Sequence, residues 1–176
     1  AVERDIAPVD ILINNAGTNR PKTMAETTED DFDTVIDLNL RAAYFVAQAI
    51  TNGLLAAEKP GSVINISSQM GHVGGPLRTV YCSSKWGLEG LTKSLAMELA
   101  PNGIRVNSIA PTFIETPLAK EMLKDAEFRE AVRSKIKLGR TGQVEDLMGA
   151  IVFLASDASA MITGASLLVD GGWTIG

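Results

Sequence analysis

The sequence predicts an α/β protein in which helices cover a parallel β-sheet on both faces. Four short runs are almost wholly apolar, as strands are when a parallel sheet is buried on both sides. Longer amphipathic stretches separate these runs, and this alternation is typical of βα units. The chain has 176 residues, of which 45% are hydrophobic, and this length suffices for one domain with a core. We therefore expect a single domain over residues 1–176.

Strands are expected at the short apolar runs. They are residues 9–13 (VDILI), 62–66 (SVINI), 104–109 (IRVNSI) and 166–169 (SLLV). The first three run directly into polar or glycine-bearing segments, which read NNAG, SS and PT. Because the ligand crevice of an open parallel sheet lies at the carboxyl ends of its strands, these three segments are expected to converge.

Amphipathic helices are expected between the strands. The first begins near Thr28, whose hydroxyl can cap a helix, and it continues to about Ile50 with apolar residues at helical spacing. A second helix is expected over residues 79–99 and a third over residues 144–154. Residues 111–137 combine two prolines with a charged helical pattern. A long insertion after a strand is often a lid or binding segment, so we expect these residues to cover a substrate.

Tyr81 and Lys85 are the most informative pair of polar residues. Four positions apart on a helix, they share one face. A nearby ammonium group favours the phenolate, so we expect the pKa of Tyr81 to be lowered toward working pH. The spacing alone is common. The Tyr81–Lys85 pair lies one loop after a strand that ends in Ser67 and Ser68, and this position strengthens the interpretation of the pair as an acid/base site.

Six motifs in order make the chain similar to the short-chain dehydrogenase/reductase family over essentially its whole length. They are NNAG at 14–17, DLNL at 37–40, the serine pair at 67–68, YxxxK at 81–85, NxxxP at 107–111 and DGG at 170–172. The resemblance implies a Rossmann-like, doubly wound parallel sheet. It also implies an enzyme that interconverts an alcohol and a carbonyl by hydride transfer, with NAD or NADP as cofactor.

The resemblance also implies roles for four catalytic residues. Tyr81 would be the acid/base, and Lys85 would bind the nicotinamide ribose and keep Tyr81 acidic. Ser68 would hydrogen-bond the carbonyl or the developing alkoxide, and it is chosen over Ser67 because it stands thirteen residues before Tyr81. Asn39 would hold a water in a proton relay to Lys85.

Further residues would bind the cofactor by the same resemblance. In addition to Tyr81 and Lys85 they are Asn14, Ala16, Gly17, Pro111, Ile114 and Thr116. The family usually has glycine after the proline where this chain has Thr112, and threonine costs little there unless the turn needs a positive φ. For Asn107 we expect a buried structural hydrogen bond rather than a ligand contact.

The chain is expected to be N-terminally truncated, as the catalytic C-terminal part of a Rossmann-like dehydrogenase. The family normally carries a strand, a glycine-rich turn and a helix before NNAG, and only eight residues precede Val9 here. The first strand is apolar on both faces, so its missing neighbour would leave a hydrophobic edge. This segment alone is therefore expected to bind dinucleotide poorly and turn over little.

The amino-acid composition favours some kinds of binding partner and disfavours others. A net charge of −5 argues against nucleic acid, which requires a basic face. No apolar run approaches a membrane span, and nothing near the lone His72 supplies a metal site. The single Cys82 cannot form an internal disulfide, which suits the cytoplasm. We expect a homo-oligomer, a dimer or tetramer, with Trp86 and Trp173 in core or subunit contacts.

Two questions remain open from the sequence. The substrate is expected to be of the sugar or polyol type, or a 3-oxoacyl thioester. The alternative to an enzyme is a catalytically silent interaction or regulatory domain that has kept the fold. The intact Ser68, Tyr81 and Lys85 count against that alternative, and the missing phosphate-binding turn counts for it.

Overall fold

The sheet has the predicted strands in consecutive order. The computed structural model describes residues 9–176, apart from the side chain of Leu118. Strands β1 (Ile11–Asn14), β2 (Gly61–Ile66), β3 (Ile104–Pro111) and β4 (Ser166–Val169) pair in the order β1-β2-β3-β4, and every pairing is parallel. The prediction of a parallel α/β sheet is confirmed.

Within residues 9–176, six α-helices and one π-helical turn connect or follow these strands. The longer helices are α2 (Glu29–Ile36), α3 (Ala42–Ala56), α4 (Thr79–Leu99), α6 (Ala126–Lys135) and α7 (Glu145–Ala155). The short α5 (Pro117–Met122) and a π-helical turn, η2 (Asp37–Arg41), complete this group. Single 3-10 turns occupy Met24–Glu26, Gln69–Gly71, Ala100–Asn102, Asp157–Ser159 and Trp173–Ile175.

The first helical stretch begins at the predicted residue but is divided in two. The Thr28 hydroxyl accepts a hydrogen bond from the Asp31 amide at 3.2 Å, and the Asp31 carboxylate accepts one from the Thr28 amide at 3.0 Å. This reciprocal pair is a capping box. The expected single helix is then interrupted by the π turn η2. A π turn inside a helix widens it locally and is often found at functional sites.

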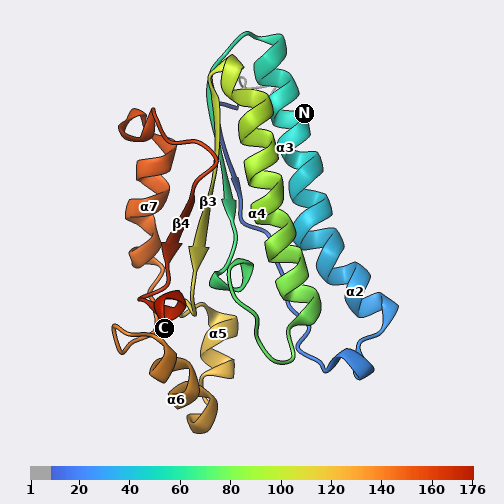
Figure 1. The fold of residues 1–176 in the computed structure, drawn as a ribbon, viewed down its shortest axis with the longest axis vertical. Helices are drawn as coiled ribbons and strands as arrows, with labels where there is room; N and C mark the ends of the chain where they lie inside the picture. Colours follow the sequence, from blue (N-terminus) through green and yellow to red (C-terminus); the bar gives the residue numbers. More distant parts are fainter. Residues whose placement is uncertain (1–8) are drawn as a thin grey trace.

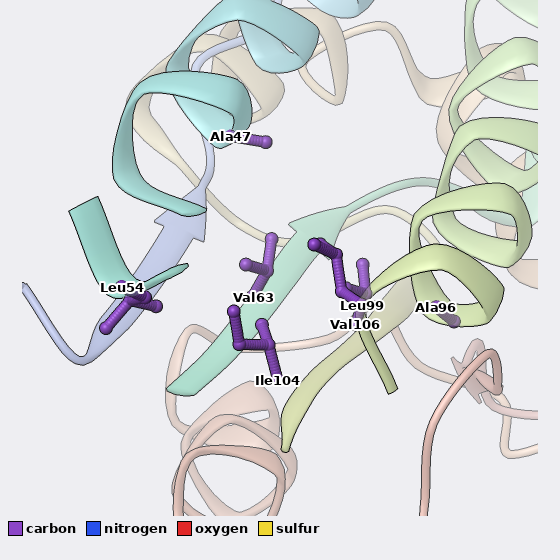
Figure 2. Close-up of a cluster of buried hydrophobic side chains, with 7 residues drawn as sticks. All are labelled: Ala47, Leu54, Val63, Ala96, Leu99, Ile104 and Val106. Atoms are coloured by element: carbon purple, nitrogen blue, oxygen red, sulfur yellow. The ribbon is translucent and has the colours of Figure 1, made fainter. Parts of the chain in front are cut away.

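The sheet is packed between two helical layers. Helices α3 and α4 cover one face, and α7 covers the other (Figure 1). The larger core cluster lies between β2, β3, α3 and α4, as Figure 2 shows. Its members are Ala47, Leu54, Val63, Ala96, Leu99, Ile104 and Val106. These two layers give the doubly wound arrangement, and they hold the strand ends rigidly enough to place a site.

The first strand lies at an edge of the described sheet. Ile11 is 46% exposed and Ile13 is 41% exposed, which agrees with the expected hydrophobic edge. No helix in the described part of the chain is both long and apolar enough to cross a membrane. The cytoplasmic location expected from Cys82 stays a prediction.

Candidate active site

A small cavity lies where the three polar segments were expected to meet. Its volume is about 180 Å³, and its lining comes from the segments that follow β1, β2 and β3 and from the start of α4. The lining residues are Asn19, Ser68, Gln69, Met70, Arg78, Tyr81, Thr112, Phe113, Ile114 and Ala119. The predicted convergence is confirmed. A larger hollow of about 750 Å³ lies at the amino ends of the strands, around Gly61 and Gly103, and contains none of the predicted site residues.

Tyr81 lines this cavity from the first turn of α4. Burial raises its pKa, while the neighbouring Ser68 hydroxyl and the charge of Arg78 act in the opposite direction. The expected lowering of the pKa by Lys85 is therefore wrong for this structure. The Lys85 ammonium lies 5.7 Å from the centre of the Tyr81 ring, and desolvation of the phenolate outweighs the surrounding positive charge.

Lys85 is buried beneath Tyr81 on the same helix face. Its Nζ donates a hydrogen bond to the Ile66 carbonyl oxygen at 2.9 Å, at the end of β2. Burial lowers the pKa of Lys85 to about 8, and the carboxylate of Glu89, one turn later, acts in the opposite direction. A lysine with this pKa can change its charge close to neutral pH, so its protonation depends on the charges around it.

Glu89 is a buried carboxylate that the sequence analysis did not single out. One oxygen accepts a hydrogen bond from the Ser108 hydroxyl at 2.7 Å, and the other lies 3.5 Å from His72 Nε2. His72 also contacts the Ser166 hydroxyl at 2.9 Å, so it is tied to the sheet. The charge of Glu89 favours the charged form of Lys85, and we therefore expect Glu89 to act as a positioning residue.

Replacing Glu89 with glutamine is expected to shift the pH dependence of activity. The variant keeps the shape and the contact with Ser108 but removes the negative charge, so the pKa of Lys85 should fall below about 8. Activity that requires charged Lys85 would then be lost at a lower pH as the pH rises. The measurement is kcat/KM across pH, with the exposed Glu98→Gln as control. An unmoved alkaline limb would contradict this role of Glu89.

Ser68 follows the carboxyl end of β2, and its hydroxyl already makes two hydrogen bonds. The hydroxyl donates to Gln69 Oε1 at 2.7 Å and accepts from the Met70 amide at 3.1 Å. A substrate oxygen that receives the Ser68 proton must therefore displace Gln69. Gln69 and Met70 both line the cavity, and Ala119 is the residue that α5 contributes.

Asn39 is fully buried within the π turn, where it joins two parts of the site. Its Oδ1 accepts from the Thr18 amide at 2.8 Å, and its Nδ2 donates to the Thr18 carbonyl at 2.9 Å and to Ser84 Oγ at 3.0 Å. The side chain thus fixes the segment after β1 against α4, one residue before Lys85. Because these contacts occupy the amide group, the expected relay through a water would have to use other atoms of Asn39.

The NNAG turn divides into a structural and an accessible part. Asn14 Nδ2 donates to Asn65 Oδ1 at 2.9 Å and to the Ala43 carbonyl at 3.2 Å, which ties β1 to β2 and α3. Ala16 and Gly17 are exposed beside the cavity. The structure therefore places the Asn14 side chain between structural elements, and leaves Ala16 and Gly17 open to a ligand.

The predicted cofactor-binding residues after β3 lie in different environments. Pro111 is buried at the end of the strand, whereas Ile114 lines the cavity. The Thr116 hydroxyl accepts from the Ala119 amide at 3.2 Å and so caps α5. Thr112 has no positive φ, which confirms that threonine is tolerated in place of glycine. Its hydroxyl is buried and without a partner among the described residues.

Asn107, Trp86 and Trp173 lie outside the cavity lining. Asn107 is buried and bonds to the Ile162 carbonyl at 2.9 Å, as expected for a structural residue. Trp86 is 54% exposed, whereas Trp173 packs against Phe113. Among the described residues, no three His, Cys, Asp or Glu side chains are grouped so as to hold a metal ion.

Arg78 is the lining residue of greatest interest that sequence reasoning missed. It stands one helical turn before Tyr81, and that spacing was a usable signal, because residues three apart at the start of a helix lie on adjacent surface. The spacing alone does not indicate a cavity residue, because an arginine at the end of a loop is usually solvated. Here the side chain is partly buried at the cavity.

The parallel sheet, helices on both faces and a polar cavity at the strand ends define the class of Rossmann-like α/β proteins. A family model described as Enoyl-(Acyl carrier protein) reductase matches residues 1–174. L-xylulose reductase of Bos taurus is 40% identical over 168 residues, covering 96% of this chain and 69% of the relative. The chain belongs to the short-chain dehydrogenase/reductase family, and it is an oxidoreductase.

Two further comparisons agree. The 3-oxoacyl-(acyl-carrier-protein) reductase of Thermotoga maritima is 42% identical over 167 residues, covering 95% of this chain and 67% of that relative. The crystal structure of a gluconate 5-dehydrogenase from Burkholderia cenocepacia J2315, in complex with NADP and tartrate, has a TM-score of 0.96 at 35% identity. That match covers 99% of this chain and 68% of the other.

Proposed function

We propose that this chain carries the catalytic residues of an enzyme that interconverts an alcohol and a carbonyl with NAD or NADP. The observation that carries the proposal is that Tyr81 and Ser68 line one cavity at the strand ends, with the Lys85 ammonium 5.7 Å from the centre of the Tyr81 ring. Family membership supports the reaction class, and the relatives named above are reductases and a dehydrogenase. The remaining question is how each residue contributes.

Gly17 supports the fit of a nicotinamide cofactor beside Lys85. A Cβ at this position would lie 3.4 Å from Asn39 Oδ1 and 3.7 Å from Lys85 Nζ, so the absence of a side chain leaves Lys85 approachable. Lys85, Tyr81, Ala16, Gly17 and Ile114 would hold the cofactor, which supplies or accepts the hydride when bound. The roles of Asn14, Pro111 and Thr116 would be to shape the turns that carry these contacts.

Tyr81 would move the proton in this reaction. Because burial raises its pKa, Tyr81 is protonated at neutral pH and suited to donate to the oxygen of a carbonyl. The Ser68 hydroxyl would hold that oxygen by a hydrogen bond, once Gln69 is displaced. Residues 111–137 would act as the lid, because Phe113, Ile114 and Ala119 line the cavity from that segment.

The substrate would be of the sugar or polyol type, or a 3-oxoacyl thioester. Relatives of both kinds match the chain at similar identity. The direct test measures consumption of reduced nicotinamide by the chain, and by the longest natural protein that contains it, with a panel of ketoses, oxo acids and 3-oxoacyl thioesters. Reduction of one class supports the proposal. If neither protein turns over any compound of the panel, the result would favour a catalytically silent domain.

We also propose that the chain forms a dimer or tetramer. Val152 and Phe153 on α7 are 63% and 37% exposed, and the adjacent edge strand β4 exposes Leu167 and Leu168 at 36% and 41%. Adjacent exposed apolar side chains of this kind are typical of subunit interfaces.

Val152→Glu is expected to reduce the oligomer to a smaller species, because it places an unpaired charge in that interface. Light scattering after size-exclusion chromatography gives the mass of each variant. Lys124→Glu, a change at an exposed residue outside α7 and β4, is the control and should keep the wild-type mass. A monomeric wild type at all concentrations would contradict the proposed interface.

A further inference from the structure

Arg78 is the one charged residue among the ten that line the catalytic cavity. Every other lining side chain is neutral, and no carboxylate faces the same space from the lining. The cavity therefore carries a single positive charge close to Tyr81. Neutral donors and acceptors are sufficient to hold the hydroxyl groups of a polyol, whereas a guanidinium forms its stronger, charge-assisted hydrogen bonds with an anionic group.

The guanidinium of Arg78 has no hydrogen-bond or ion-pair partner among residues 9–176. Two other arginines are partly buried, and both use their N–H groups inside the protein. Arg105 donates to Ser159 Oγ at 2.7 Å and to the Leu154 carbonyl at 2.9 Å, and Arg129 donates to the Leu123 carbonyl at 2.9 Å. Arg78 alone of the three keeps its donors free.

The Arg78 side chain is nevertheless held in place. Its guanidinium carbon lies 5.8 Å from the centre of the Phe113 ring, a cation–π arrangement that orients the planar group at the cavity. Burial lowers the pKa of Arg78, yet a guanidinium stays charged in proteins. A partly buried cation without a partner is unfavourable, and an anionic ligand that enters the cavity would remove this cost.

We propose that Arg78 binds a carboxylate of the substrate while Tyr81 exchanges a proton with a hydroxyl or carbonyl oxygen elsewhere in the same molecule. This inference rests on the proposed oxidoreductase function and narrows its substrate class to small hydroxy acids and oxo acids, such as sugar acids. The planar guanidinium matches a carboxylate in a two-pronged arrangement.

Cavity size agrees with a small acid. The volume of about 180 Å³ is below the roughly 300–1,000 Å³ of pockets that enclose drug-sized ligands. A long acyl chain would have to extend outside it. The inference thus separates the two substrate types left open above, and it favours an acid of sugar size over both a neutral polyol and a long acyl thioester.

The test compares acids with their matched neutral alcohols. D-gluconate with D-glucitol and D-xylonate with xylitol are suitable pairs, because each differs mainly in a carboxylate against a hydroxymethyl group. For each protein, kcat/KM is measured for both members of a pair with NAD and NADP. The rise in melting temperature caused by each compound is a second readout that does not need turnover.

Wild type should have a higher kcat/KM for the acid than for its alditol. Arg78→Met should lower the ratio of these two kcat/KM values about 10- to 100-fold, mainly by raising KM for the acid. Arg78→Lys should have a ratio between those of wild type and Arg78→Met, because lysine keeps the positive charge but lacks the planar guanidinium that can donate two parallel hydrogen bonds. Arg129→Met, which changes a partly buried arginine outside the cavity lining, should keep the wild-type ratio.

Two results would overturn the proposal. One is a wild type that does not distinguish any acid from its alditol in either readout. The other is an Arg78→Met variant that loses both members of a pair equally, which would assign Arg78 a structural role over Phe113. If either result is obtained while the protein still turns over substrate, the proposal for Arg78 is wrong but the proposed oxidoreductase function is not contradicted. Failure of that function is seen separately, as absence of turnover in the full carbonyl panel.

Discussion

Tyr81→Phe is expected to lower kcat/KM for carbonyl reduction by about 10²- to 10⁴-fold, the usual contribution of a positioned general acid. The variant removes only the phenolic oxygen from a side chain that lines the cavity. The ring keeps its packing on α4, so the melting temperature and the circular dichroism spectrum should change little. Steady-state kinetics with reduced nicotinamide and the best carbonyl of the panel provide the measurement.

The chain offers a matched control for this experiment. Tyr44 is the other tyrosine, and it is 43% exposed on α3, outside the cavity lining. Tyr44→Phe removes the same atom and should leave the rate near that of wild type. Equal rates for wild type and Tyr81→Phe would remove Tyr81 from the reaction and would favour a mechanism with another proton donor.

The same residue sets the expected pH dependence. Burial raises the pKa of Tyr81, so the phenol is protonated through neutral pH. As far as Tyr81 itself is concerned, reduction uses the protonated form and should persist until the pH is well above the pKa of Lys85, whereas oxidation of an alcohol requires deprotonated Tyr81 and should increase as the pH rises. Arg78 lowers this pKa, so Arg78→Met should move both limbs to higher pH.

Local patterns in the sequence predict much of this fold. Helix α4 (Thr79–Leu99) has the predicted bounds, because its apolar residues recur at helical spacing and pack on the sheet. The start of α2 was predicted for the same kind of reason, since a capping box involves residues three apart. The convergence of the strand-end segments follows from the parallel topology alone.

Contacts between distant residues could not be predicted in the same way. Asn65 lies in an apolar strand and gives no local signal, yet its side chain accepts from Asn14 and donates to Thr92 Oγ1 at 2.9 Å. Glu89 reads as an ordinary charged residue of a helix face, although it is buried 3.5 Å from His72. The sign of the Tyr81 pKa shift was also inaccessible, because it depends on how deeply the phenol is buried.

Ile64→Ala is expected to lower the free energy of unfolding by about 2–5 kcal/mol, the cost of truncating a buried isoleucine. Ile64 is completely buried in the middle of β2, in a cluster with Ile109 and Leu154 that fastens α7 to the sheet. Domains are stable by only about 5–15 kcal/mol, so this change removes a large share of the total. Urea unfolding followed by circular dichroism measures it.

Graded controls separate lost packing from other causes. Ile64→Val removes one methylene and should cost about 0.5–1.5 kcal/mol, and Met161→Ala, at a residue that is 98% exposed, should stay within about 0.5 kcal/mol. A small effect of Ile64→Ala would mean that α7 contributes little to holding β2. That result would matter for catalysis as well, because β2 ends at the Ile66 carbonyl that binds Lys85 and leads directly to Ser68. The rigidity of the proposed active site therefore depends on the packing of this strand between its two helical layers.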